Sequence, residues 1–145
     1  MKVLIQRVKR ASVTIEGKIY SSINSGILAF VGIEKGDDKE KSEKLAKKIV
    51  NLRIFSDENG KMNLSLLNTN GEMLIVSQFT LCGDCKKGTR PSFDKSASPD
   101  IANELYEYFI NQVEFNGVKT KHGKFGADME VSIINDGPVT FMLED

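Results

Sequence analysis

Gly26-Ile27-Leu28-Ala29-Phe30-Val31-Gly32-Ile33 is the longest apolar run in the sequence. A continuous apolar stretch of this length is typical of a β-strand that is buried on both faces. A helix that crosses a lipid bilayer needs about 20 apolar residues, so the run is too short to span a membrane. It therefore predicts a central strand in the core of a packed domain.

Two β segments and a turn precede this run. The first extends from Val3 to Val8, and the second is Ser12–Ile15. Gly17-Lys18 follows the second segment and is a turn signal, because glycine tolerates backbone conformations that other residues avoid. We therefore expect the N-terminal part of the chain to form strands on either side of a tight turn.

Helix signals occur twice after the apolar run. Asp37-x-x-Glu40 has the spacing of a capping box, in which the two side chains bond unpaired backbone N–H groups at the helix start. Ser98-Pro99-Asp100 is expected to begin a second helix, and Asn116-Gly117 to end it. The expected buried faces are Leu45, Ala46, Ile49, Val50 and Leu52 in the first helix, and Ile101, Leu105, Tyr108, Phe109 and Val113 in the second.

The remaining segments complete a β-rich pattern. Asn59-Gly60 and Asn70-Gly71 predict hairpin turns, because Asn and Gly tolerate positive φ. Met73–Val76 is a strongly apolar strand, and two more strands are expected near Met129–Ile134 and Val139–Leu143. A length of 145 residues fits one domain, residues 1–145. The predicted fold class is α/β, a β-rich single domain with mostly antiparallel sheets and two packing helices.

Charge and cysteine content limit the function classes. The 20 basic residues equal the 20 acidic ones, so RNA contacts would have to come from local patches rather than from an overall field. The 40% apolar and 28% charged content argues against disorder. The start of the chain lacks the long apolar region of a secretory signal, which predicts a cytoplasmic protein. Two cysteines form no disulfide framework and fit a reducing compartment.

Cys82, Cys85 and His122 are the residues that generic cysteine or histidine chemistry would use. A zinc site needs four ligands, whereas the chain has no second cysteine pair and only one histidine. A thioredoxin-like thiol pair needs a helix directly after it, and the following segment opens none. A Ser–His–acid triad would have to combine His122 with Ser77 or Thr80. We expect an incidental cysteine pair and a solvated histidine.

Basic residues gather in two places. The first cluster is expected to be the solvated face of the first helix. The second lies in a loop close to the end of the Met73–Val76 strand, where contact with phosphate and plain solvation remain alternatives. The clusters are Lys44, Lys47 and Lys48, and Lys86, Lys87 and Arg90.

Two polar segments interrupt apolar strands. Ser77-Gln78-Phe79-Thr80-Leu81 is either a strand leaving the core or the floor of a site, in which backbone N–H groups stabilise an oxyanion and hydroxyls orient substrate. Asn135-Asp136-Gly137-Pro138-Val139-Thr140 lies between two apolar strands, where Gly-Pro usually marks only a turn. Neither segment alone indicates a function.

Together, however, the two segments resemble the signature motifs of the D-aminoacyl-tRNA deacylase family. The resemblance extends over essentially the whole chain and agrees in length, order and spacing. It includes Gln6-Arg7-Val8, Asn51–Phe55, Arg90–Phe93 and Gly123–Met129. On these motifs the sequence is identified as a member of this family.

The resemblance implies a proofreading esterase that cleaves a D-amino acid from the 3′-terminal adenosine of tRNA. For this chain we expect sheets that form a barrel-like core and no metal or organic cofactor. Similar proteins are homodimers with an active site at the subunit interface. In them, one subunit presents a cis Gly-Pro peptide, here Gly137-Pro138 braced by Arg7, to the site of the other. The residues implied to line the catalytic site are Ser77, Gln78, Phe79 and Thr80, with Met129 near its gate.

The chemistry of a Gly-Pro turn suggests how such a site selects chirality. A cis X–Pro bond lies only about 0.5–1 kcal/mol above trans. Carbonyl oxygens that face the substrate α-carbon would overlap an L side chain, whereas a D side chain points elsewhere and glycine has none. The expected substrates are therefore D-aminoacyl-tRNA and glycyl-tRNA, and L-aminoacyl esters are expected to be rejected. The family resemblance implies that the glycyl-tRNA is glycine mischarged on tRNA-Ala.

Two catalytic routes and two other functions remain open at this point. The resemblance implies that the 2′-OH of the tRNA assists the attack of water, with the Phe79 or Thr80 N–H as oxyanion donor. Thr80 as a nucleophile is the second route, since no base is evident for it. An RNA-binding module without catalysis would need the basic clusters alone, and a thiol redox protein would need Cys82 and Cys85.

Overall fold

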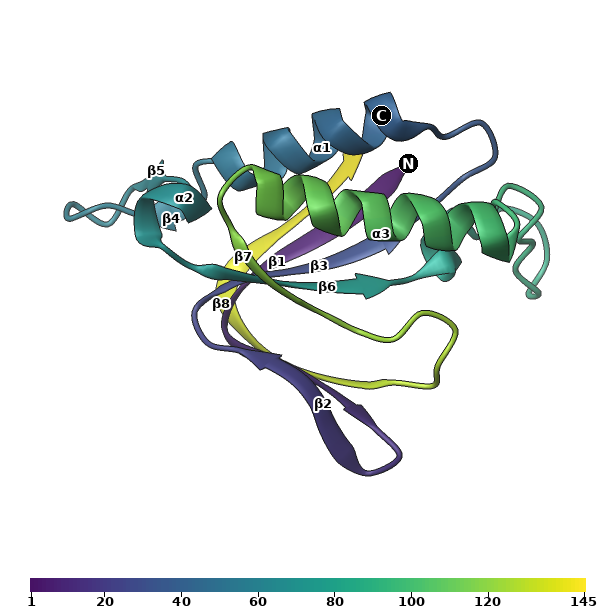
Figure 1. Ribbon diagram of the computed structural model, residues 1–145, viewed down its shortest axis with the longest axis horizontal. Coiled ribbons are helices and arrows are strands. Elements are labelled where there is room, and N and C mark those ends of the chain that lie inside the picture. The colour runs from purple at the N-terminus through teal and green to yellow at the C-terminus, as the bar shows by residue number, and fades with distance from the viewer.

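The apolar run forms β3 (Gly26–Gly32), which lies inside a six-stranded sheet in the computed structural model of residues 1–145. Two helices, α1 (Lys39–Asn51) and α3 (Pro99–Phe115), lie side by side on one face of this sheet (Figure 1). None of the helices is long and apolar enough to cross a membrane. The other strands of the sheet are β1 (Lys2–Ile15), β2 (Lys18–Ile23), β6 (Glu72–Ser77), β7 (Lys119–His122) and β8 (Glu130–Glu144).

The connections explain the order of the strands. Neighbours follow the order β2-β1-β3-β6-β7, and β8 pairs with β1. β1 is antiparallel to β2, β3 and β8, whereas β6 is parallel to both β3 and β7. Parallel neighbours need a crossover connection, and α1 and α3 lie in the two crossovers that flank β6. The predicted α/β domain with mostly antiparallel pairing is confirmed. β7 is a short polar strand without the apolar pattern that would predict it.

The sheet curls until its two ends meet. β2 and β7 are the last strands of the order at opposite ends, yet the Ser21 hydroxyl of β2 donates to the His122 carbonyl of β7 over 2.8 Å. The predicted barrel-like core is therefore confirmed. The curl encloses a small apolar cluster of Val8, Ala11, Val13, Ile23, Leu28, Leu74 and Val76.

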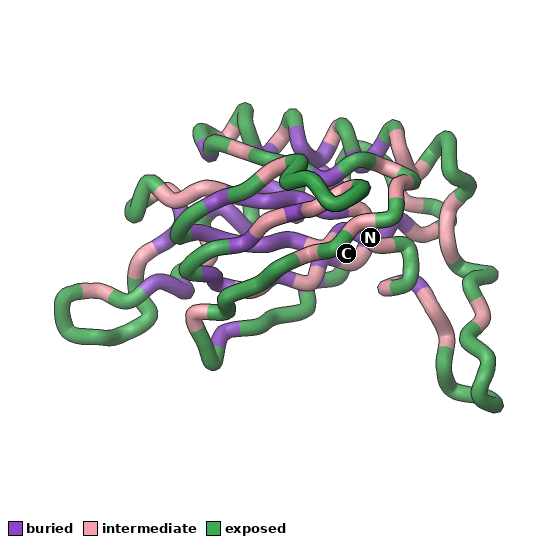
Figure 2. The backbone as a smooth tube through the Cα atoms, turned by 90° about the horizontal axis from the view of Figure 1, so that it is seen from below, coloured by how far each residue is buried: buried purple, intermediate pink, exposed green.

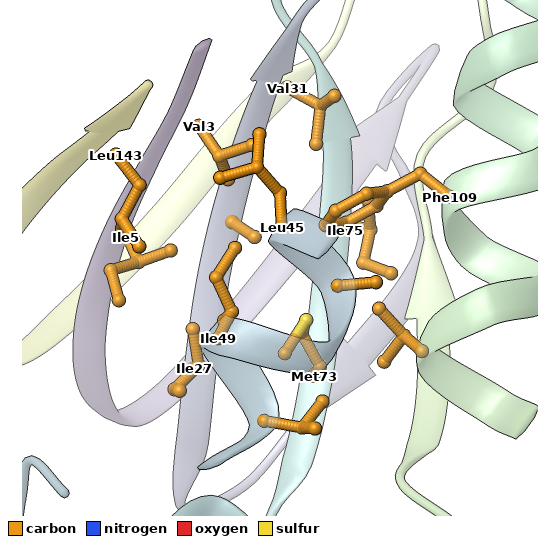
Figure 3. Packing of buried hydrophobic residues seen from close by; sticks show 14 of the residues in the cluster. Val3, Ile5, Ile27, Val31, Leu45, Ile49, Met73, Ile75, Phe109 and Leu143 are labelled. Carbon is orange, nitrogen blue, oxygen red and sulfur yellow. The ribbon is translucent and has the colours of Figure 1, made fainter. Parts of the chain in front are cut away.

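A larger apolar cluster lies between the sheet and the helices. Leu45 and Ile49 of α1 and Phe109 of α3 point onto the strands, where Ile75 of β6 and Val3 of β1 meet them (Figure 3). Figure 2 shows buried positions on the central strands and along one side of the helices, and mostly exposed positions in the loops. Each fully buried Leu, Ile or Phe stabilises the fold by about 1.5–3 kcal/mol. The cluster therefore fixes β6 and α3, which position the site.

β1 and β8 are each one long strand, although the sequence predicts two separate segments for each. The register between the two strands shifts twice around Val8. Val3 and Ile5 contact the larger cluster, whereas Val8 and Ala11 contact the smaller one. A bulge that moves side chains to the other face interrupts the two-residue period, so in the sequence it resembles the end of a strand.

The start of α1 differs from the predicted capping box by one residue. Asp38 is the N-cap, and its carboxylate accepts from the Lys41 amide over 2.9 Å. Asp37 instead accepts from the N-terminal amino group over 2.6 Å. A part-buried ammonium group needs such a partner, and this long-range demand is invisible in the local pattern. The predicted stripe of α1 is buried, except that Leu52 is half-buried at the C-cap.

One of the two predicted Asn-Gly hairpins is confirmed. Asn59-Gly60 joins β4 (Phe55–Ser56) to β5 (Met62–Leu64), which pair antiparallel. The prediction for Asn70-Gly71 is wrong, because Asn70 caps the end of a short helix, α2 (Leu66–Thr69), at φ +51°. Asn adopts this left-handed conformation both in hairpins and at helix ends, so the pair alone does not distinguish them.

The buried face of α3 is rotated from the predicted one. Leu105, Phe109 and Val113 are buried as expected, together with Tyr106 and Ile110. The prediction is wrong for Ile101, which is 52% exposed in the first turn, and for Tyr108, whose hydroxyl donates to Glu43 of α1. A helix buries a stripe about 100° wide, and the tilt of the helix decides which flanking positions it includes.

Candidate functional site

β6 ends in a tight turn that leaves backbone N–H groups unpaired. The Gln78 amide donates to the Val31 carbonyl of β3 over 2.8 Å, and a single 3-10 turn, η1 (Phe79–Cys82), follows. The first N–H groups of a helical turn have no partner within it. Those of Phe79 and Thr80 donate to no carbonyl in the loops and turns. Two adjacent amide donors are thus available for an oxyanion.

The side chains of this segment are accessible, and none of them is activated by a base. Phe79 is 56% exposed, and its ring packs on Phe93 with centroids 5.1 Å apart. The exposed Thr80 hydroxyl accepts a hydrogen bond from Gln78 Nε2 at 2.5 Å. Ser77 ends the strand and is half-buried. No histidine, lysine or carboxylate bonds the Thr80 hydroxyl, so no group of this chain is placed to remove its proton.

Arg7 holds the Gly137-Pro138 turn from inside the sheet. The Gly137–Pro138 peptide bond is cis, and both residues are exposed. Arg7 Nε lies 3.0 Å from both the carbonyl and the carboxylate of Asp136, and Nη1 donates to the Ile54 carbonyl at 2.6 Å. A buried guanidinium needs partners for its donors. Arg7 therefore ties the residue before the turn to the body of the domain.

Asn135 clamps the turn from its other side. Its side-chain Nδ2 donates to the Arg7 carbonyl at 2.9 Å and to the Val139 carbonyl at 3.3 Å, so one amide spans the turn. A Cβ on Gly137 would lie 2.5 Å from Asn135 Oδ1. A side chain at position 137 would displace the Asn135 amide, and the turn presents backbone and a proline ring to solvent.

Within one chain, the Ser77–Thr80 segment and the Gly137-Pro138 turn lie far from each other. Ser77 in β6 lies beside Val31 in β3, which is opposite Val3 in β1. Arg7, which holds the turn, is farther along β1 by about 13 Å at 3.3 Å per residue. β8 is separated from β6 by β3 and β1, or about 14 Å at 4.8 Å between neighbouring strands. The structure therefore does not bring Gly137 and Pro138 to Ser77, Gln78, Phe79 and Thr80 within one subunit.

The chain matches a known family over nearly its whole length. The sequence profile described as D-Tyr-tRNA(Tyr) deacylase matches residues 4–144. The chain belongs to this family. It is 58% identical over 144 residues to the D-aminoacyl-tRNA deacylase of Thermosipho africanus (strain TCF52B) and 57% identical over 144 residues to that of Geobacter sp. (strain M21). Each alignment covers 99% of this chain and 97% of the relative. The enzyme is thus assigned D-aminoacyl-tRNA deacylase activity, the hydrolysis of a carboxylic ester.

Two solved structures share the fold of this chain. A protein described as c-Myc DNA Unwinding Element Binding Protein superposes with a TM-score of 0.95 at 42% identity, covering 100% of this chain and 99% of that one. A probable eukaryotic D-amino acid tRNA deacylase superposes with a TM-score of 0.83 at 15% identity, covering 98% and 97% of the two chains. The second likeness bears on the fold alone.

Tyr106 of the enzyme anchors the end of β6, a role that no sequence motif indicates. Its hydroxyl donates to the Ile75 carbonyl at 2.8 Å, and the Gly123 amide donates to the same oxygen at 2.9 Å. Burial raises the pKa of Tyr106, so the hydroxyl remains a donor. The ring lies 6.0 Å from that of Phe125. The sequence signal that could have predicted its burial is the spacing from Tyr106 to Ile110, which lies one turn farther along the helix and therefore on the same face.

Met129 lies on the opposite face of β6 from Tyr106. It packs against the small apolar cluster, which includes Val76, whereas Ile75 belongs to the larger cluster. A Cβ on Gly123 would come within 2.6 Å of Met129 Sδ, so the glycine makes room for the thioether. Met129 is half-buried beside the last residues of β6, which places it next to the candidate site.

The cysteines and the histidine of the enzyme form no shared centre. Cys82 is buried, its Sγ donates to the Ile33 carbonyl at 3.4 Å, and burial raises the pKa of its thiol. Cys85 is exposed. His122 is exposed on β7, and its Nδ1 lies 2.8 Å from the Gly123 carbonyl. No three His, Cys, Asp or Glu side chains are grouped so that they could hold a metal ion.

Proposed function

We propose that the enzyme edits tRNA in the cytoplasm as a homodimer. Each active site would combine the Ser77–Thr80 strand end of one subunit with the Gly137-Pro138 turn of the other. The separation of these motifs within one chain carries the proposal, because each motif alone is half of the site that the family resemblance implies. A two-fold axis would supply the missing half to both subunits at once.

The exposed edge of β8 supports an association between copies. β8 pairs only with β1, so its 15 residues leave one row of backbone groups unpaired. Long open edges with apolar side chains favour pairing with another chain. The Gly137-Pro138 turn lies in this same strand, which would bring it to the partner. The exposed large apolar residues of the strand are Ile133, Ile134, Phe141 and Met142.

The turn would select substrate by exclusion. Gly137 and Pro138 are exposed, and the Asn135 clamp and Arg7 restrict their movement. Rigid backbone against the substrate α-carbon would overlap an L side chain, while a D side chain or the hydrogen of glycine would fit. Selection of this kind needs no recognition of the side chain itself. It would therefore act on many D-aminoacyl-tRNAs and on glycyl-tRNA mischarged on tRNA-Ala.

Catalysis would rest on positioning and on backbone donors. The Phe79 and Thr80 N–H groups would bind the developing oxyanion, and the 2′-OH of the terminal adenosine would assist the attacking water. Thr80 is the less favoured nucleophile, because proton transfer contributes about 10²–10⁴-fold and its hydroxyl contacts only Gln78. Aminoacyl-tRNA, bound by its 3′ end, would thus be the substrate, and its own 2′-OH would take part in catalysis.

A comparison of three esters tests this function. D-tyrosyl-tRNA and glycyl-tRNA are expected to be hydrolysed well above the uncatalysed rate, and L-tyrosyl-tRNA is expected to stay at that rate. The measurement is release of the amino acid from labelled tRNA with and without the enzyme. Equal turnover of the D and L esters would contradict exclusion by the turn, and inertness toward glycyl-tRNA would contradict selection without a side chain.

A further inference from the structure

The loop between η1 and α3 has a defined shape and projects from the domain. Asp84 and Ser92 form a two-way backbone bridge, with N···O distances of 2.8 and 3.0 Å, which closes the loop at its base. Gly88 lies between them at φ +67° and turns the chain. In Figure 1 this loop extends beyond the start of α3, at the end of the molecule opposite β4 and β5. The bridge and the turn therefore hold the side chains of this loop in one region of the surface.

Positive charge gathers in that region. Four basic side chains line a hollow of about 330 Å³ in the loop, and Lys2 joins two of them in a neighbouring hollow. The only acids that line the two hollows are Asp84 and Asp94. The basic residues of this surface, here called the basic loop, are Lys86, Lys87, Arg90 and Lys95.

The two acids offset only part of the positive charge of the basic loop. The Asp84 carboxylate accepts from the Lys86 amide at 2.9 Å, and this bond lowers the pKa of Asp84. The Asp94 carboxylate accepts from the Ser92 hydroxyl at 2.7 Å. None of the four basic side chains lies within 4.0 Å of a carboxylate oxygen, so all four charges remain available to an external anion.

The basic loop is continuous with the candidate catalytic floor. Phe93, just after the loop bridge, packs on Phe79 with ring centroids 5.1 Å apart. Gly83, just before the bridge, is so close that an added Cβ would lie 3.0 Å from the Thr80 carbonyl and 3.0 Å from the Phe93 ring. An anion held by the loop would therefore lie beside a group bound at Phe79 and Thr80.

We propose that the basic loop binds backbone phosphates of the tRNA acceptor arm and so positions the 3′ ester on the catalytic floor. This inference rests on the proposed function, which puts that ester at Phe79 and Thr80. An RNA chain that ends there must continue across the protein surface, with one phosphate for each nucleotide. Lys and Arg are the side chains that bind such phosphates, largely without regard to sequence. The loop thus fixes where the substrate lies rather than which tRNA it is.

A charge-matched pair of variants tests the proposal. The loop variant is Lys86→Gln/Lys87→Gln/Arg90→Gln. The control variant, Lys44→Gln/Lys47→Gln/Lys48→Gln, removes three charges from α1, which runs toward β4 and β5 at the other end of the molecule (Figure 1). We expect kcat/KM for D-tyrosyl-tRNA to fall about tenfold or more in the loop variant and less than about twofold in the control.

Salt dependence separates phosphate contacts from a general loss of activity. Each phosphate contact contributes about 0.7–0.9 to the slope of log affinity against log salt. The slope for kcat/KM should therefore be shallower by about 2–3 in the loop variant and unchanged in the control. The loss should be confined to substrates with backbone phosphates, so D-tyrosyl-adenosine should show less than a twofold difference between the two variants.

The outcomes distinguish this inference from the proposed function. If the unmodified enzyme hydrolyses no D-aminoacyl-tRNA, the proposed function fails. If it does so, and the loop variant matches the α1 control in both kcat/KM and salt slope, the basic loop binds no phosphate and the inference alone is overturned. An equal loss with D-tyrosyl-adenosine would also overturn it, because the loop would then act on the catalytic floor and not on the RNA backbone.

Discussion

Gly137 lies where the Asn135 side chain leaves no space for a methyl group. The Asn135 amide donates to the Arg7 carbonyl of β1 and to the Val139 carbonyl after the turn, and each such bond contributes about 1 kcal/mol. We expect Gly137→Ala to displace this amide, because the new Cβ would lie 2.5 Å from Asn135 Oδ1. The predicted result is at least a tenfold fall in kcat/KM for D-tyrosyl-tRNA, with a loss of about 1–3 kcal/mol in the free energy of unfolding.

Asn135→Ala is the matched control, since it removes the clamp without adding the clash. Both variants should lose activity by a similar factor, which single-turnover hydrolysis measures. Urea unfolding measures the accompanying loss in the free energy of unfolding. Full activity in Gly137→Ala would show that the clamp does not shape the site.

The Thr80 hydroxyl distinguishes assistance by RNA from nucleophilic attack by the protein. Its partner in the chain is Gln78, and no base contacts it. Thr80→Ala should therefore lower the single-turnover rate only modestly, less than about tenfold, because a positioning contact is lost and not the general base catalysis worth about 10²–10⁴-fold. A D-tyrosyl-tRNA that ends in 2′-deoxyadenosine should lose far more.

The same rates must be measured after each protein is shown to fold and to bind tRNA. If Thr80→Ala abolishes hydrolysis while the 2′-deoxy substrate reacts normally, Thr80 is the nucleophile and assistance by the 2′-OH is refuted.

At the scale of elements, Tyr106 joins α3 to the end of β6. Because burial raises the pKa of Tyr106, the folded chain keeps a proton that the unfolded chain loses above about pH 10. The stability that this contributes is present below the unfolded pKa and is lost as pH rises above it. We expect Tyr106→Phe to lower the free energy of unfolding by about 1 kcal/mol at pH 7 and to unfold with a weaker pH dependence above pH 10.

Urea titrations of both proteins from pH 7 to 11 would measure this difference. Tyr20→Phe is the control, since Tyr20 is exposed on β2 and does not join α3 to β6. Parallel curves for Tyr106→Phe and the unmodified chain would show that the Tyr106 bond to Ile75 does not tie the two elements together.

The elements also show what the sequence can and cannot predict. Apolar runs and glycine turns are local, so β3, β6 and the hairpin at Asn59-Gly60 follow from the pattern. Asp38 caps α1, whereas Asp37 accepts from the Glu34 amide and from the N-terminal amino group, and the second of these partners lies outside the local sequence. Parallel pairing of β6 with β3 and β7 depends on crossovers and leaves no local mark. At bulges the buried side chains move to the other face of the strand, so in the sequence β1 and β8 each resemble two separate strands.

At the scale of the molecule, the sequence motifs identify the residues of the site but not their arrangement. Ser77–Thr80 and Gly137-Pro138 are both recognisable from sequence, as is the association of Arg7 with the turn. Their separation depends on the order and register of four strands, which only the folded chain reveals. That separation is the physical reason for proposing a site built from two subunits.

Purified heterodimers test this arrangement most directly. One subunit carries Phe79→Pro, which removes an amide donor at the first position of η1, where proline is tolerated. The other carries Gly137→Ala, and the two are separated from homodimers by different affinity tags.

Each variant homodimer should be nearly inactive. A site shared between subunits predicts that this heterodimer has one intact site and about half of the unmodified rate. A second heterodimer, with both changes in one subunit and none in the other, should have no intact site and no activity. The reverse pattern, an inactive first heterodimer and a half-active second one, would contradict the shared site.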